Sequence, residues 1–147
     1  MSETISISAA RESISKRWIA QWGVTSLYCF DNEKFVPPKP AAPGTAETAE
    51  SCWCRIVTRQ LVSTQETIAP VGSRKYSRQA MVQIQVFVPV DMGTLASDTL
   101  TAAARTVFEG VKFDSLHFYA GNTREIGIDG KWYQVNVEVP FTYYDTH

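Results

Sequence analysis

The chain has 147 residues, of which 44% are apolar and 20% charged, and its net charge is near −1. This length suits one domain with its own core, and the composition excludes a wholly disordered chain. Balanced charge argues against a nucleic-acid coat or a polybasic membrane binder, and no apolar run approaches the ~20 residues that cross a bilayer. We therefore expect a single domain over residues 1–147, kept in a reducing cytosol and without a membrane partner.

Residues 5–21 predict an amphipathic helix. Its apolar residues recur at helical spacing and form one stripe, made of Ile7, Ala10, Ile14, Trp18 and Trp22. Two tryptophans give the helix a large apolar surface, so this surface must pack against another part of the protein or against a partner. It docks either on its own sheet or, through Trp18 and Trp22, partly on a neighbouring subunit.

Residues 36–50 form a Pro/Ala-rich segment without periodicity, which contains Pro37, Pro38 and Pro40. Proline cannot donate to a strand ladder or continue a helix, so a long loop is predicted. In a monomer this loop is a dispensable flap. In an assembly it is an arm that becomes ordered on a partner, with the three prolines as contact residues.

Two strands are predicted over 53–63 and 80–89, where apolar and polar residues alternate. The stretch between them, 64–79, predicts the tip of a long β-hairpin that projects from the body, because Pro70 and Gly72 are turn residues. Three cations, Arg74, Lys75 and Arg78, make this hairpin tip basic. We treat them as candidate interface residues.

The rest of the chain predicts a second helix over 94–109, ended by Gly110, and then more strands. Residues 112–128 are interpreted as one bent strand broken near 121–122, and 129–130 as a two-residue turn into a strand over 132–142. The expected fold is α+β, with a mainly antiparallel mixed sheet and two helices packed on one face.

Motifs for catalysis or cofactor binding are missing. The sequence has no glycine-rich nucleotide loop and no nucleophile elbow, and His117 has no neighbouring carboxylate placed to orient it. Cys52 and Cys54 are spaced as C-x-C and lack a second pair of ligands, so buried or half-buried thiols are the expected state of the three cysteines. We expect no enzyme activity, no cofactor and no metal site.

Charge is unevenly distributed along the chain. Residues 51–80 carry a net charge of +4, and residues 81–147 carry −4. This separation favours head-to-tail contact, in which the basic hairpin of one subunit reaches an acidic face of the next, and such contacts close into rings. A solvated hairpin tip and binding to a phosphate backbone are the alternatives.

A string of landmarks across most of the chain resembles the tail terminator family of long-tailed bacteriophages. The landmarks are Trp22, the run 30–35 leading into Pro37 and Pro38, Trp53–Arg55, Val86–Pro89 leading through Gly93 into an alanine-rich helix that ends at Phe108, Trp132–Val137, and Pro140–Tyr144. Their order and spacing together carry the resemblance. The Pro-rich insert and the Cys52-Trp53-Cys54 triplet depart from the family pattern.

The resemblance implies a virion structural protein of the tail–neck region that is assembled in the host cytoplasm. Family members form a homohexameric ring that docks on the last ring of the tail tube, ends tube polymerisation and presents the surface for head–tail joining. Its partners are copies of itself, the tail tube protein and a head-completion or connector protein, and DNA passes through the lumen without sequence-specific binding. No catalytic residue is implied.

Two other functions also agree with the sequence. One is another neck component, a head-closure or connector protein, which shares the assembly logic but binds on the portal side. The other is a small ligand-binding α+β domain that uses the aromatic stretch 132–144.

Overall fold

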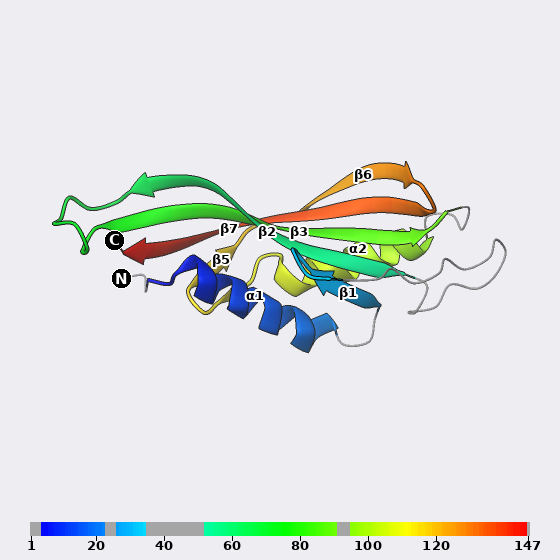
Figure 1. The fold of residues 1–147 in the computed structure, drawn as a ribbon, viewed down its shortest axis with the longest axis horizontal. Helices are drawn as coiled ribbons and strands as arrows, with labels where there is room; N and C mark the ends of the chain where they lie inside the picture. The colour runs from blue at the N-terminus through cyan, green and yellow to red at the C-terminus, as the bar shows by residue number, and fades with distance from the viewer. Residues whose placement is uncertain (1–3, 23–25, 35–51, 91–94, 147) are drawn as a thin grey trace.

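A computed structural model gives the fold and describes residues 4–22, 26–34, 52–90 and 95–146. The domain is α+β, as predicted, and the Pro-rich segment with Pro37, Pro38 and Pro40 lies outside the described residues. The elements in chain order are α1 (Ile7–Trp22), β1 (Leu27–Phe30), β2 (Trp53–Gln65), β3 (Lys75–Pro89), α2 (Leu95–Phe108), β4 (Lys112–Phe113), β5 (Leu116–Phe118), β6 (Asn122–Asp129) and β7 (Trp132–Thr146) (Figure 1).

The strands form one mixed sheet in the order β1-β2-β3-β7-β5-β4. β1 runs parallel to β2, and the other pairs are antiparallel. β3 and β7 pair over their whole length, from Lys75 with Thr146 to Pro89 with Trp132. The other edge of β7 is shared, because β6 pairs with its first half and β5 with residues 141 and 142.

Both helices lie on the same side of the sheet and cover its apolar face (Figure 1). The predicted stripe of α1 is confirmed, since Ala10, Ile14, Trp18 and Trp22 are all buried. Opposite them, the inward side chains of β3 are fully buried valines and an isoleucine, namely Val82, Ile84, Val86 and Val88. Alternation along β3 therefore sends every second side chain into one core beneath the helices.

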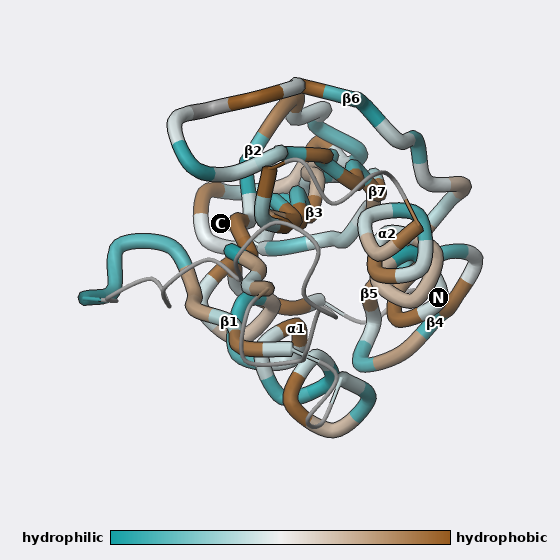
Figure 2. Tube along the Cα trace, turned by 90° about the vertical axis from the view of Figure 1, so that its right-hand side faces the viewer, coloured by the Kyte–Doolittle hydropathy of each residue, from teal (hydrophilic) through white to brown (hydrophobic). Residues whose placement is uncertain are grey.

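A second, smaller cluster lies on the other face of the sheet. The rings of Trp53 and Phe87 stack with their centroids 4.0 Å apart, and Trp132 meets Trp53 edge-on at 6.1 Å. Cys29 completes this cluster. Viewed along the length of the molecule, the sheet is curled rather than flat, with β6 and α1 at opposite sides (Figure 2).

The helix ends follow local rules where the structure describes them. Ser6 caps α1, because its Oγ accepts a hydrogen bond from the backbone N–H of Ala9 at 3.2 Å. Gly110 follows α2 with φ +67°, the left-handed conformation predicted for it. Within the described ranges, neither helix has the length and apolar character of a bilayer span.

Two parts of the sheet differ from the prediction. β1 was not predicted, and it adds the parallel edge of the sheet. Residues 112–128 form three strands instead of one bent strand, because Asp114 and Ser115 take positive φ values of 47° and 65° and turn the chain between β4 and β5. Two consecutive residues with positive φ are uncommon without glycine, so this turn was not predicted.

Candidate interaction surface

Residues 61–79 carry the β2–β3 pair beyond the helices and are termed the arm (Figure 1). After a bulge that follows Gln60, pairing resumes at Ser63 with Arg78 and continues to Gln65 with Tyr76. The far end of β7 pairs with the same stretch of β3, from Gln79 with Thr142 to Lys75 with Thr146. Three strands therefore support the arm, which is stiffer than an isolated two-stranded ribbon.

The three candidate cations of the arm contact groups within the arm and β7. Arg78 Nε donates to Asp145 Oδ1 at 2.9 Å, in a pair whose side chains are 24% and 14% exposed. Lys75 Nζ lies 4.5 Å from the centroid of the Tyr144 ring, and Arg74 Nε donates to the Ala69 carbonyl at 2.7 Å. These contacts brace the arm, so the cations shape the surface that it presents as well as charging it.

The loop at the end of the arm, residues 66–74, is organised by its own hydrogen bonds. Thr67 Oγ1 accepts from the backbone N–H of Lys75 at 2.9 Å. The N–H of Ser73 donates to the Pro70 carbonyl at 3.0 Å, which closes a turn with Gly72 at φ +96°. That positive φ is where a turn of this kind requires glycine. The turn places Val71 at its apex.

Apolar side chains on the arm are exposed to solvent. Ile68 is 102% exposed and Val71 is 82% exposed, and we term these two residues the tip knob. Leu61 and Val62 are also exposed, further down the arm. None of these four residues was selected from the sequence, although two β-branched apolar residues around a Pro-x-Gly turn were a readable signal.

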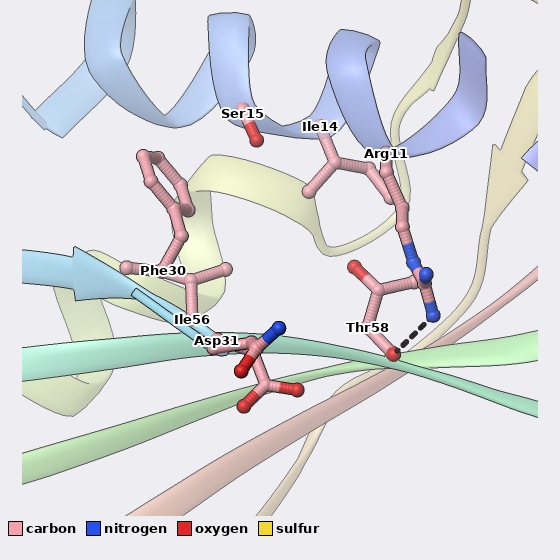
Figure 3. Close-up of a pocket in the computed structure, with 8 residues that line it drawn as sticks. Arg11, Ile14, Ser15, Phe30, Asp31, Ile56 and Thr58 are labelled. Atoms are coloured by element: carbon pink, nitrogen blue, oxygen red, sulfur yellow. Dashed lines mark hydrogen bonds between the residues drawn. The ribbon is translucent and has the colours of Figure 1, made fainter. Parts of the chain in front are cut away.

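A pocket of about 320 Å³ lies between α1 and the strands β1 and β2, and is termed the α1–β1 pocket (Figure 3). Its lining residues are Arg11, Ile14, Ser15, Phe30, Asp31, Asn32, Ile56 and Thr58. Arg11 reaches across from the helix and donates to the Thr58 carbonyl at 3.3 Å, and Asp31 is tied to β2 because its N–H donates to the Ile56 carbonyl at 3.0 Å. This pocket was not predicted from the sequence, because β1, which forms one side of the pocket, was not predicted either.

Trp18 and Trp22 are corrected as interface candidates. They are 0% and 2% exposed, and their rings stack on each other with centroids 4.3 Å apart. Trp18 also stacks on Phe108 of α2, and the indole N–H of Trp22 donates to Ser26 Oγ at 3.2 Å. The chain's own sheet and second helix cover both rings, so neither ring is accessible to a neighbouring subunit.

The cysteines and His117 form no reactive group with each other in the part of the chain that the structure describes. Cys29, Cys52 and Cys54 are buried, as predicted, and form no disulfide. Burial raises the pKa of the Cys29 thiol in spite of the nearby Arg55 guanidinium. His117 is exposed and lies against the Tyr119 ring at 4.5 Å. Among the described residues, no group of three or more His, Cys, Asp or Glu could hold a metal ion.

Comparisons with known proteins bear on the fold. No family model and no curated protein sequence matches the chain. Among solved structures, 12 chains match. One of them, a protein whose name states no function, is 17% identical and aligns over 97% of this chain and 96% of its own length with a TM-score of 0.62. At this identity the likeness shows that the two chains share a fold along nearly their whole length.

Proposed function

We propose that this protein is a ring-forming assembly protein of a phage tail, a tail terminator that caps the tube and offers the surface for head–tail joining. The proposal joins the sequence landmarks described above with the shape of the arm. A terminator must bind a tube end tightly and leave no surface on which a further tube ring can add. A closed ring with two chemically different faces meets both needs.

The arm is the observation that carries the proposal. It extends beyond the helices, is braced by the Arg78–Asp145 pair, and ends in the exposed tip knob of Ile68 and Val71. These two side chains bury little or none of their surface against their own chain, so they add almost nothing to the stability of the core. Stiff projections with exposed apolar ends suit contact with another protein.

The distribution of charge supports head-to-tail contact. Arg74, Lys75 and Arg78 all lie on the arm or at its base, whereas the chain from residue 81 onward is net acidic. Subunits that pair a basic element with an acidic face meet in one orientation, which favours ring closure over random association.

The ligand-binding alternative has weaker support. In the stretch 132–144, Trp132 packs edge-on against Trp53, and Phe141 and Tyr143 are buried in the main core. These aromatic rings are used for packing. If the protein is instead another neck component, a head-closure or connector protein, it should bind a portal-side partner in place of the tube protein.

The first prediction concerns the oligomeric state. We expect the full chain to sediment as a hexamer at high concentration or when tail tube protein is added, because heterologous contacts close into a ring and the family resemblance implies six subunits in it. Analytical ultracentrifugation over a concentration series checks this. A monomer under both conditions contradicts the proposal, and binding to a portal-side protein but not to the tube favours the other neck component.

The second prediction concerns the charge of the arm. Arg74→Glu combined with Lys75→Glu should leave the thermal unfolding temperature within a few degrees of wild type, because both residues lie outside the core. Ring formation should be impaired, since like charges now face each other across the contact. Arg74→Lys with Lys75→Arg is the matched control that keeps the charge. Equal assembly of the reversed and the control variants would reject this role for the arm.

A further inference from the structure

The tip knob has a fixed shape before any partner binds. Gln65 Nε2 donates to the Thr67 carbonyl at 2.8 Å, and the turn closed between Pro70 and Ser73 holds Val71 at its apex. An apolar group that is already ordered loses little conformational entropy when it enters a pocket. The knob is therefore ready to act as an anchor.

The α1–β1 pocket is a concave surface of mixed character. Ile14, Ile56 and the ring of Phe30 give it an apolar part, although the two isoleucines are only 1% and 3% exposed. Its other lining residues are polar or charged, namely Arg11, Ser15, Asp31, Asn32 and Thr58. Figure 3 shows Ile14 and Ser15 pointing from the helix toward the strands. The side chains of an isoleucine and a valine contain seven carbon atoms at roughly 30 Å³ each, or about 200 Å³, if each is taken at the volume of a water molecule. The pocket of about 320 Å³ can hold both.

Charges around the two surfaces also match. The loop of the knob carries one acid and one base, Glu66 and Arg74. The rim of the pocket likewise carries one base and one acid, Arg11 and Asp31. Each charge on the loop therefore has an opposite charge available at the rim, which favours docking in one register.

The knob cannot reach the pocket of its own chain. Thr58 borders the pocket, and β2 continues from it as extended strand to Gln65 before the loop begins. Seven residues of strand span about 23 Å. Figure 1 shows that this stretch runs away from α1, so the knob and the pocket lie at separate places on the molecule.

We propose that the tip knob of one copy of this chain, Ile68 and Val71, inserts into the α1–β1 pocket of a second copy. The inference rests on the proposed ring and adds one anchoring contact to it, at a pocket built from residues 11–58 and so outside the acidic stretch that begins at residue 81. Because the knob and the pocket are different surfaces, each subunit offers one and accepts one. Such a contact is heterologous and closes into a ring when the rotation between subunits allows.

Two variants of the full chain test the contact from its two sides. Ile68→Asp removes the anchor, and Ser15→Trp fills the pocket from the wall of α1. Each should weaken self-association about 30-fold or more, the size of a hot-spot loss. The matched controls are Ile128→Asp, which places the same charge at a residue 72% exposed on β6, and Ala20→Trp on an exposed part of α1. Both controls should assemble like wild type, and circular dichroism should show all four variants folded.

Disulfide trapping identifies the neighbours directly. A Val71→Cys chain mixed with a Ser15→Cys chain should form a mixed disulfide under mild oxidation, whereas a Val71→Cys chain mixed with an Ala20→Cys chain should not. The native cysteines are buried and do not compete. If both Ile68→Asp and Ser15→Trp assemble like wild type and no mixed disulfide forms, this contact is overturned, but the proposal of a ring is not. A dimer held by the contact supports it but rejects the ring, and a chain that never self-associates, with or without tube protein, rejects both.

Discussion

Replacement of Trp18 by alanine is expected to lower the free energy of unfolding by about 3–5 kcal/mol, the usual cost of truncating a buried tryptophan or phenylalanine. Trp18 is 0% exposed and is among the largest fully buried side chains of the described residues. Its ring stacks on Trp22 at 4.3 Å and on Phe108 at 6.3 Å, and meets Tyr28 edge-on at 6.2 Å. Truncation leaves a cavity where α1, α2 and β1 meet. The closely packed neighbouring rings can move into this cavity only partly.

A second substitution at the same position separates packing from polarity. Among the described residues the indole N–H of Trp18 is buried without a hydrogen-bond partner. Trp18→Phe keeps an aromatic ring in the stack and removes that unpaired donor, so its loss should be about 1–2 kcal/mol. Urea unfolding followed by far-UV circular dichroism measures both variants.

Ile19→Ala is the control for helix propensity and side-chain size on the neighbouring position. Ile19 is 50% exposed, so this change should stay within about 0.5–1 kcal/mol of wild type. If Trp18→Ala costs no more than Ile19→Ala, then α1 contributes little to stability and its docking is weaker than the packing indicates. That result would also remove support for the α1–β1 pocket, since α1 supplies Arg11, Ile14 and Ser15 to its wall.

Long periodic segments were predictable from the sequence. The stripe of α1 and the alternation of β3 are local patterns, and each is repeated over enough residues to outweigh a single exception. The tryptophans show where this reasoning stops. Periodicity placed Trp18 and Trp22 on the apolar side of a helix, but only the tertiary structure shows that Phe108 and Ser26 are there to receive them.

Elements that depend on distant partners were not predictable. β1 has four residues and is defined by its parallel register with β2, from Leu27 with Trp53 to Phe30 with Ile56, and nothing local signals that pairing. The α1–β1 pocket follows from β1 and was missed with it. The turn at Asp114 and Ser115 was missed because two consecutive residues take a left-handed conformation there, which is rare without glycine even though aspartate tolerates it better than most residues.

The arm was partly predictable. Composition alone placed three cations in residues 64–79, but their partners come from strand register. Arg78 reaches Asp145 because β3 and β7 pair with Tyr76 opposite Asp145, across 67 positions of sequence. Ile68 and Val71 around the Pro-x-Gly turn could have been noticed in the sequence, but their exposed fractions of 102% and 82% are known only from the structure.

The last prediction is a loss of stability in alkali that comes from one buried thiol. Burial raises the pKa of Cys54 from 9.0 to about 12, and the contact of its sulfur with Ser26 Oγ at 3.6 Å offsets this only in part. In the unfolded chain the thiol ionises as the pH passes 9, whereas in the folded chain it keeps its proton until about 12. The stability is therefore present in full below pH 9 and falls as the pH rises toward 12.

At pH 10.5 the pH lies about 1.5 units above the unfolded pKa, and each unit is worth about 1.4 kcal/mol, so the loss from this thiol is about 2 kcal/mol. Cys54→Ala removes the thiol and should cost some stability at pH 7.5 through lost packing. Between pH 7.5 and 10.5 the variant should then regain about 2 kcal/mol relative to wild type. Burial also raises the pKa of Tyr143, which remains in both proteins and cancels in the comparison.

Ile56→Val is the matched control, because Ile56 lies two residues along the same strand, is 3% exposed and carries no titratable group. Its difference from wild type should be the same at both pH values. Urea unfolding in the presence of a reducing agent measures the three proteins at pH 7.5, 9.0 and 10.5. A constant difference between wild type and Cys54→Ala would mean that the thiol ionises as readily in the folded protein as in the unfolded chain. The surroundings of Cys54, where its sulfur contacts Ser26 Oγ, would then be more open to water than the structure shows.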